Sequence, residues 1–246
     1  MAREGILRYK LEKLEEQQEL YWRQRAKVHW LRDGDRNTNF FHKFASERRR
    51  RNKIKKLVKE DGGVVENERE MHELITNFYK DLFRSCAGTR YDELLDQVQQ
   101  KVTSEMNQFL LKEMTDDEIK AALDSMGELK APGKDGMPVL FYRHFWDTVG
   151  ADVIREVKSF LSGGVMPMGW NETVVVLIPK VPNPERIKDL RPISLRNVIY
   201  KIASKVLSNR LKVILPDIIA LNQSAFVPGR MITDNVLLAY EMTHYM

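Results

Sequence analysis

A run of β-branched and apolar residues from Thr173 to Ile178 restricts the possible folds of this 246-residue chain more than any other segment. Its length and composition predict a β-strand that is buried on at least one face. A loop with three prolines ends this strand, and residues 192–195 are suited to a second short strand. We therefore predict a hairpin-like finger with Lys180 on one arm and Arg191 on the other.

The two cations of this finger suit a polyanionic ligand that must be gripped and released. Arg191 offers a planar fork for phosphate oxygens, and Lys180 offers a compact, mobile point charge. Solvated surface cations are the commoner alternative for any single Lys or Arg. Position in the sequence therefore leaves both interpretations open.

Several segments in and around the finger carry a family resemblance. They are KAPGKDGMP (130–138), LIPK (177–180), DLRPISL (189–195), NVIYKIASKVLSNRL (197–211) and QSAFVPGRMITDN (223–235). In this order they resemble the opening motifs of reverse transcriptases of non-LTR (LINE-type) retrotransposons, in the variety common in plants. The resemblance covers most of residues 115–246. Arg196 departs from the pattern, because a small residue or a cysteine is expected there.

The resemblance implies a fold class and an activity. The expected fold is α+β, mostly helical with short β-hairpins, and comprises the fingers and the start of the palm of the right-hand polymerase fold. The complete family enzyme is an RNA-directed DNA polymerase whose palm carboxylates hold Mg²⁺. No YxDD sequence occurs in this chain. We therefore expect a truncated, inactive fragment with no catalytic residues, no metal ligands and no stably bound Mg²⁺.

The resemblance also implies which residues contact ligands. Lys180, Arg191 and Gln223 match positions that bind the incoming nucleotide. Phe226, Gly229 and Arg230 match a motif beside the template. Residues 130–138 match a loop packed against the finger region near the template, where Gly133 and Gly136 permit close approach of a phosphate or a strand backbone.

Basic residues are concentrated near the N-terminus. Residues 23–56 contain thirteen Lys or Arg and three acidic residues, a net charge of +10 in a chain whose total is +5. Such a block indicates a polyanionic partner, most commonly nucleic acid. The segment resembles the one that joins endonuclease and reverse transcriptase in plant LINE products. That resemblance implies that Arg48, Arg49, Arg50 and Arg51 contact template RNA.

Three aromatic residues, Phe40, Phe41 and Phe44, precede the four arginines. Aromatic rings beside cations can stack on bases while the cations hold phosphates. Alternatively, the rings dock the segment on the core and the arginines form a solvated helix face. A host-adopted RNA-binding module and a non-functional pseudogene product are two further interpretations of the whole chain.

The remaining composition limits partners and compartment. The single cysteine and the scattered histidines predict neither a disulfide framework nor a zinc site. No apolar run is long enough for a membrane span or a signal peptide. We expect a nuclear or cytoplasmic protein that is not secreted. Its expected partners are template RNA, with DNA as a second candidate, and deoxynucleotide triphosphates in the full enzyme, while its oligomeric state stays open.

Local patterns predict three domains and several elements. The domains are a basic helical extension (1–54), a hairpin with helices (55–114) and a partial reverse transcriptase domain (115–246). Thr115 and Glu118 form a capping box at the start of a helix. Residues 55–67 read as a β-hairpin whose turn demands a positive φ. Gly150 is expected to separate two core helices.

The segment from Val198 to Leu211 predicts an amphipathic helix. Its expected inward residues are Ile202, Val206 and Leu207, and its expected outward cations are Lys201, Lys205 and Arg210. These cations are placed where they could flank a nucleic-acid groove, although such helix cations are usually only solvated.

Overall fold

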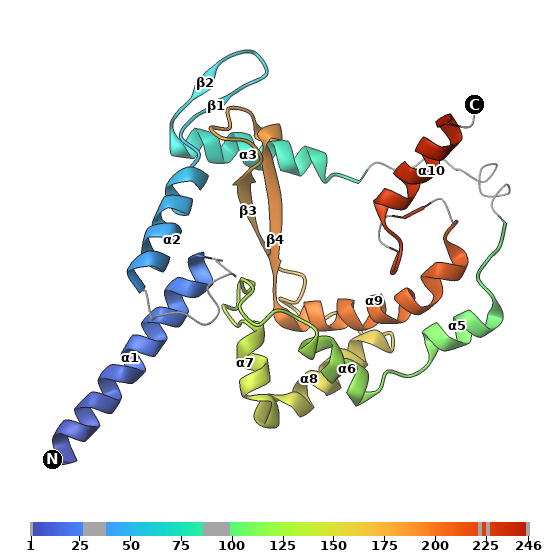
Figure 1. Cartoon of the computed structure of the whole chain (residues 1–246), viewed down its shortest axis with the longest axis horizontal. Helices are drawn as coiled ribbons and strands as arrows, with labels where there is room; N and C mark the ends of the chain where they lie inside the picture. Colours follow the sequence, from blue (N-terminus) through green and yellow to red (C-terminus); the bar gives the residue numbers. More distant parts are fainter. Residues whose placement is uncertain (1, 27–37, 86–98, 221–222, 225–226, 245–246) are drawn as a thin grey trace. The chain divides into compact units, whose positions relative to one another are not determined.

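The finger is a two-stranded sheet of β3 (Thr173–Pro179) and β4 (Leu190–Arg196) in the computed structural model of the chain (Figure 1). The 3-10 turn η1 (Ile187–Asp189) leads the loop into β4. The prediction of a buried strand is wrong for the first half of β3, because Val174, Val175 and Val176 are 40–43% exposed. Two strands cover too little of each other to bury a face on their own.

The structure describes residues 2–26, 38–85, 99–220, 223–224 and 227–244, which belong to two compact units. The first unit comprises residues 1–86 with 175–194, and the second comprises residues 87–174 with 195–246. Most of the finger therefore groups with the N-terminal segment, although it is distant in sequence. The domain boundaries expected near residues 54 and 114 stay predictions.

The first unit is built around the finger and the segment that precedes residue 86. Its elements are α1 (Ala2–Ala26), α2 (Thr38–Asn52), β1 (Leu57–Val58), β2 (Val64–Val65) and α3 (Glu68–Leu82). Its core contains Leu57, Val65, Met71, Tyr79, Ile187 and Leu190, with Leu177 packed against them. The predicted β-hairpin is confirmed, with Leu57 opposite Val65 and Gly62 at a φ of 87° in the turn.

The loop of the finger is fastened to β1. Val58 N–H donates to the carbonyl of Glu185 at 2.7 Å. The Glu185 carboxylate also forms an ion pair with Lys56 Nζ at 2.9 Å. Since Ile187 and Leu190 enter the core two and five residues later, the finger and the β1–β2 hairpin share one core.

The second unit is mainly helical. Its elements are α5 (Ser104–Leu111), α6 (Asp116–Asp124), α7 (Val139–His144), α8 (Trp146–Leu161), α9 (Val198–Ile218) and α10 (Ile232–His244). The core residues come from α6, α7, α8 and α9, with Met114 before α6 and Trp170 after α8. The predicted capping box is confirmed, because Thr115 Oγ1 accepts from Glu118 N–H and Glu118 Oε2 accepts from Thr115 N–H. No helix of the described residues is long and apolar enough to cross a membrane.

Gly150 does not separate two helices, contrary to the prediction. It lies inside α8, and the chain turns at Phe145 between α7 and α8. A Cβ atom at Gly150 would lie 2.7 Å from Cε2 of the Trp146 indole. This glycine is therefore present because a ring packs on it, and tertiary contact outweighs its cost of about 1 kcal/mol in a helix interior.

Arg210 is not an outward cation, and this prediction is also wrong. The residue is 5% exposed, whereas Leu207, which was expected to face inward, is 43% exposed. Arg210 follows Ile202 and Val206 at intervals of four residues, so it lies on the buried face of α9. Its guanidinium pairs with Glu118 through two hydrogen bonds of 2.8 Å.

Candidate nucleic-acid interface

Lys180 and Arg191 lie on one face of the finger. Lys180 N–H donates to the carbonyl of Asp189 at 2.7 Å, which sets these two residues opposite each other. Ile178, two residues before Lys180, is then opposite Arg191, two residues after Asp189. Side chains two positions apart in a strand lie on the same face. Leu177 and Leu190 point to the other face, into the core. The two predicted cations therefore lie on the face that points away from this core.

The ammonium group of Lys180 is held near the end of the finger. Its Nζ donates to the carbonyl of Lys188 at 2.6 Å, which leaves its remaining N–H groups for a ligand. Arg191 is exposed, as is the Lys180 side chain itself. The finger thus presents a positioned point charge and a planar fork to solvent.

The loop of residues 130–138 packs against the start of α9 in the second unit. A Cβ atom at Gly133 would lie 2.4 Å from the Asn197 backbone nitrogen and 2.5 Å from the Arg196 carbonyl carbon. Asn197 fastens the loop further, because its Oδ1 accepts from Asp135 N–H at 3.4 Å and its Nδ2 donates to Gly169 at 3.2 Å. The sequence predicts that either a phosphate or a strand backbone approaches Gly133 closely. The structure shows the backbone at the end of β4 there.

Cations gather beside this loop, but several are already engaged. Lys201 Nζ donates to the carbonyl of Ala131 at 3.3 Å, and burial lowers the pKa of its ammonium group. Lys134 pairs with Glu172 at 2.8 Å. The guanidinium of Arg196, the residue that departs from the family pattern, lies 4.4 Å from the ring centroid of Tyr200. Their main contacts are therefore within the protein.

Arg230 has a structural role that the sequence does not reveal. Its guanidinium donates to the carbonyls of Pro216, Ile219, Ala220 and Gln223 at 2.6–3.3 Å. These groups lie at and just beyond the C-terminus of α9, where carbonyls lack helical partners. Arg230 therefore caps α9 and holds the backbone of Gln223, and its contact with template stays a prediction.

The other predicted residues of this motif are placed only in part. Gln223 is exposed. Gly229 adopts a φ of 79°, a left-handed conformation that suits glycine. Phe226 lies outside the described residues. The structure thus brings Gln223 and Arg230 together.

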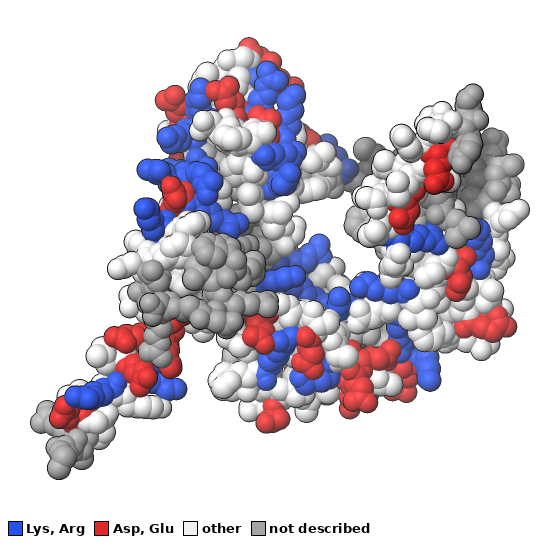
Figure 2. Space-filling view, in the orientation of Figure 1, with Lys and Arg blue, Asp and Glu red and all other residues white. Residues whose placement is uncertain are grey.

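The four arginines of the basic segment lie on α2, and Lys and Arg gather over this helix in the space-filling view (Figure 2). Arg49, Arg50 and Arg51 are exposed, and Arg48 is half-buried. Of the aromatic residues, Phe41 is 3% exposed and Phe44 is 38% exposed. Phe41 is therefore buried, whereas Phe44 meets solvent.

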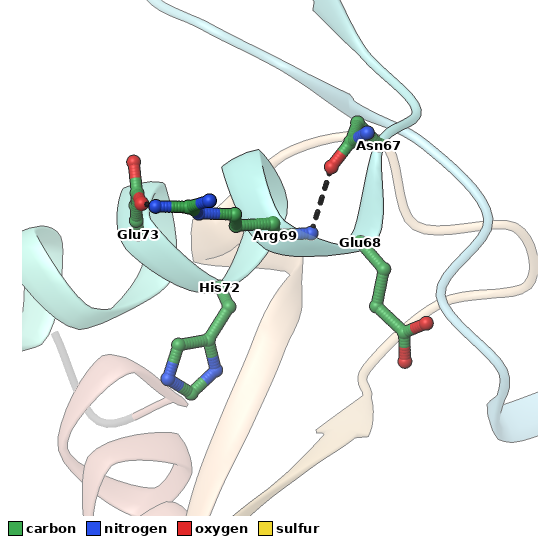
Figure 3. A pocket seen from close by; sticks show the side chains of 5 residues that line it. All are labelled: Asn67, Glu68, Arg69, His72 and Glu73. Carbon is green, nitrogen blue, oxygen red and sulfur yellow. Dashed lines mark hydrogen bonds and ion pairs between the residues drawn. The ribbon is translucent and has the colours of Figure 1, made fainter.

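Two hollows in the first unit are lined by residues other than the predicted site residues. One of about 680 Å³ lies at the start of α3, where Asn67 Oδ1 accepts from Arg69 N–H at 2.9 Å (Figure 3). The other, of about 900 Å³, lies between the β1–β2 turn, α3 and η1. Lys180, Arg191 and Arg48 to Arg51 line neither hollow.

Among the described residues, no group of three or more His, Cys, Asp or Glu side chains is arranged to hold a metal ion. The Mg²⁺ expected in the complete enzyme stays a prediction.

Comparison with known proteins links the chain to a transposon. No protein-family model matches it. It is 35% identical over 224 residues to an uncharacterized 149 kDa protein of transposon TX1 from Xenopus laevis. The match covers 90% of this chain and 17% of that protein. The chain is therefore related to a short part of a transposon-encoded protein.

Proposed function

We propose that the chain is the fingers region of a non-LTR retrotransposon reverse transcriptase, which contacts nucleotide and template while other parts of a longer protein supply catalysis. The observation that carries this proposal is the shared face of Lys180 and Arg191 on the finger. The similarity to a transposon protein over 90% of the chain supports it. So does the packing of residues 130–138 on the start of α9, directly after the finger in sequence.

The finger would bind the triphosphate of a nucleotide by charge-assisted hydrogen bonds. The planar guanidinium of Arg191 can take two phosphate oxygens, and the ammonium of Lys180 can take a third. Because the carbonyl of Lys188 orients Lys180, part of the entropic cost of ordering this side chain is met before the ligand binds. The finger contributes binding and orientation, and no covalent step.

Replacing Lys180 or Arg191 with alanine is expected to weaken binding of a deoxynucleotide triphosphate by about tenfold or more for each residue, the value of a charged hydrogen bond. Titration of a fluorescent deoxynucleotide in low salt would measure this. Lys188→Ala is a matched control, since it removes a nearby charge and keeps the carbonyl that accepts from Lys180. Equal losses in all three variants would contradict a specific site.

A second candidate function is RNA binding through α2 alone. It is favoured by the exposed arginines at the C-terminal end of this helix. This function needs no polymerase activity, so it would hold for a host-adopted module as well as for a retrotransposon fragment.

Changing Arg48, Arg49, Arg50 and Arg51 to alanine is expected to weaken RNA binding and to flatten its salt dependence. Each arginine that no longer neutralises a phosphate lowers the slope of log K against log salt by about 0.7 to 0.9. A filter-binding series between low and physiological salt would show it. The control removes four exposed cations of the second unit, Lys101, Lys112, Arg155 and Lys212. An RNA affinity that changes neither with salt nor with the α2 substitutions would refute this function.

A further inference from the structure

The aromatic residues of α2 differ in their exposure to solvent. Phe41 is 3% exposed, and Phe44 is 38% exposed with its ring centroid 4.7 Å from that of Phe40. His42 contacts the Trp22 ring of α1 at 4.3 Å. At 100° per residue, His42 lies on roughly the opposite side of α2 from Phe40 and Phe44. The contact with α1 therefore leaves the Phe44 side of the helix open.

Helical spacing places arginines beside the exposed ring. Phe40, Phe44 and Arg51 lie within about 40° of one another around α2, and Arg48 flanks them one turn after Phe44. Along the axis, Arg48 and Arg51 follow Phe44 by about 6 and 10 Å. We call Phe40, Phe44, Arg48 and Arg51 the aromatic–basic ridge. Glu47, the acidic residue of α2, lies on the same side of the helix, about 60° from Phe44 and about 40° from Arg51. The four arginines and Lys43 outnumber it, so the helix is strongly positive.

We infer that the aromatic–basic ridge binds single-stranded RNA, with an unpaired base stacked on Phe44 and the neighbouring phosphates held by Arg48 and Arg51. This inference rests on the RNA binding proposed above. The Phe44 ring is 38% exposed, and an aromatic ring in contact with solvent beside cations can stack on a base.

Single strands fit the ridge better than duplexes. In an A-form helix the bases are paired and stacked on one another, so a side chain meets phosphates and 2′-hydroxyls. A phenylalanine can stack only on a base that is unpaired or splayed out. A duplex would therefore contact the arginines of the ridge through its phosphates and would not stack on Phe44.

The test compares Phe44→Leu with the unchanged full-length chain on a single-stranded RNA and on a hairpin of equal length. Loss of one stacked base is expected to weaken single-strand binding by about 5- to 150-fold and to leave the salt slope unchanged. Hairpin binding should stay within about twofold. Phe44→Trp should keep the affinity, and its fluorescence should be quenched by the stacked base.

Phe83→Leu is the control for the ring, because Phe83 is 65% exposed on another helix end of the same unit. Circular dichroism of each variant would verify that the helices are kept. RNA binding that responds to the arginine substitutions but not to Phe44→Leu would overturn the inference and leave the RNA-binding function standing. Equal loss of single-strand and hairpin binding in Phe44→Leu would overturn it as well.

Discussion

Replacing Arg210 with methionine is expected to lower the free energy of unfolding of the second unit by about 1–3 kcal/mol, the usual cost of leaving buried hydrogen-bond acceptors without a donor. The Arg210 side chain is 5% exposed and pairs with Glu118 through two hydrogen bonds. It also donates to the carbonyls of Leu110, Lys112 and Glu113. Methionine fills much of the same volume, so the loss would come from these unpaired polar groups rather than from a cavity.

Urea unfolding followed by circular dichroism would measure this loss. Lys205→Met is the matched control, because Lys205 lies on the same helix and is only half-buried. Its replacement should change the free energy of unfolding by no more than about 0.5 kcal/mol. Similar losses for the two variants would show that the contacts of Arg210 contribute little net stability.

Lowering the pH should remove the stability that the Arg210–Glu118 ion pair contributes. The hydrogen bonds from Arg210 are the main cause that lowers the pKa of Glu118 from 4.5 to about 2. A carboxyl whose pKa is lower in the folded state contributes stability above its unfolded pKa and loses it as pH falls through the folded pKa. The difference in unfolding free energy between the unchanged chain and Arg210→Met should therefore shrink between about pH 5 and pH 2.

Arg210 belongs to a set of arginines that the sequence does not distinguish from ligand-binding cations. Arg143 donates to the carbonyls of Leu123, Asp124 and Met126 at the end of α6. Arg230 does the same for α9. Each guanidinium has several donors in a rigid fork, so one side chain can satisfy several carbonyls at a helix end. Part of the positive charge of the chain is therefore structural.

Local patterns predicted the elements well because their causes are local. The capping box depends on two residues three positions apart, and the β1–β2 hairpin depends on a glycine turn between apolar pairs. The partner of Arg210 is 92 residues away and that of the Lys201 side chain is 70 residues away. Such partners are fixed by packing, which no local pattern contains. One signal was present, since Ile202, Val206, Arg210 and Ile214 follow at intervals of four.

In the candidate site, too, some features follow from local sequence and others depend on packing. The placement of Lys180 and Arg191 on one hairpin could be predicted, because two segments of strand composition flank the proline-containing loop that joins β3 and β4. That they share the face away from the core depends on register, which the hydrogen bond between Lys180 and Asp189 sets. Likewise, the sequence left open whether Phe41 or Phe44 docks α2, because both rings suit either role.

Gly133→Ala is expected to detach the loop of residues 130–138 from the start of α9 and to cost about 1–3 kcal/mol of stability, as overpacking does. The added Cβ would lie 2.2 Å from Asn197 Oδ1, 2.4 Å from Asn197 N and 2.5 Å from Arg196 C. Asn197 Oδ1 belongs to a side chain that can turn away, but the other two atoms are backbone. Either the loop or the turn between β4 and α9 must therefore move.

Gly136→Ala separates this contact from the general effect of losing a glycine in the same loop. Gly136 has a φ of 73° and open space around its Cα, so alanine there costs roughly 1–2 kcal/mol of backbone strain without a clash. Amide hydrogen exchange distinguishes the two variants. The amide of Asp135, which donates to Asn197, should lose protection in Gly133→Ala and keep more of it in Gly136→Ala. Retained protection in Gly133→Ala would mean that Gly133 is not needed for close backbone packing, and would return it to the alternative ligand, a phosphate.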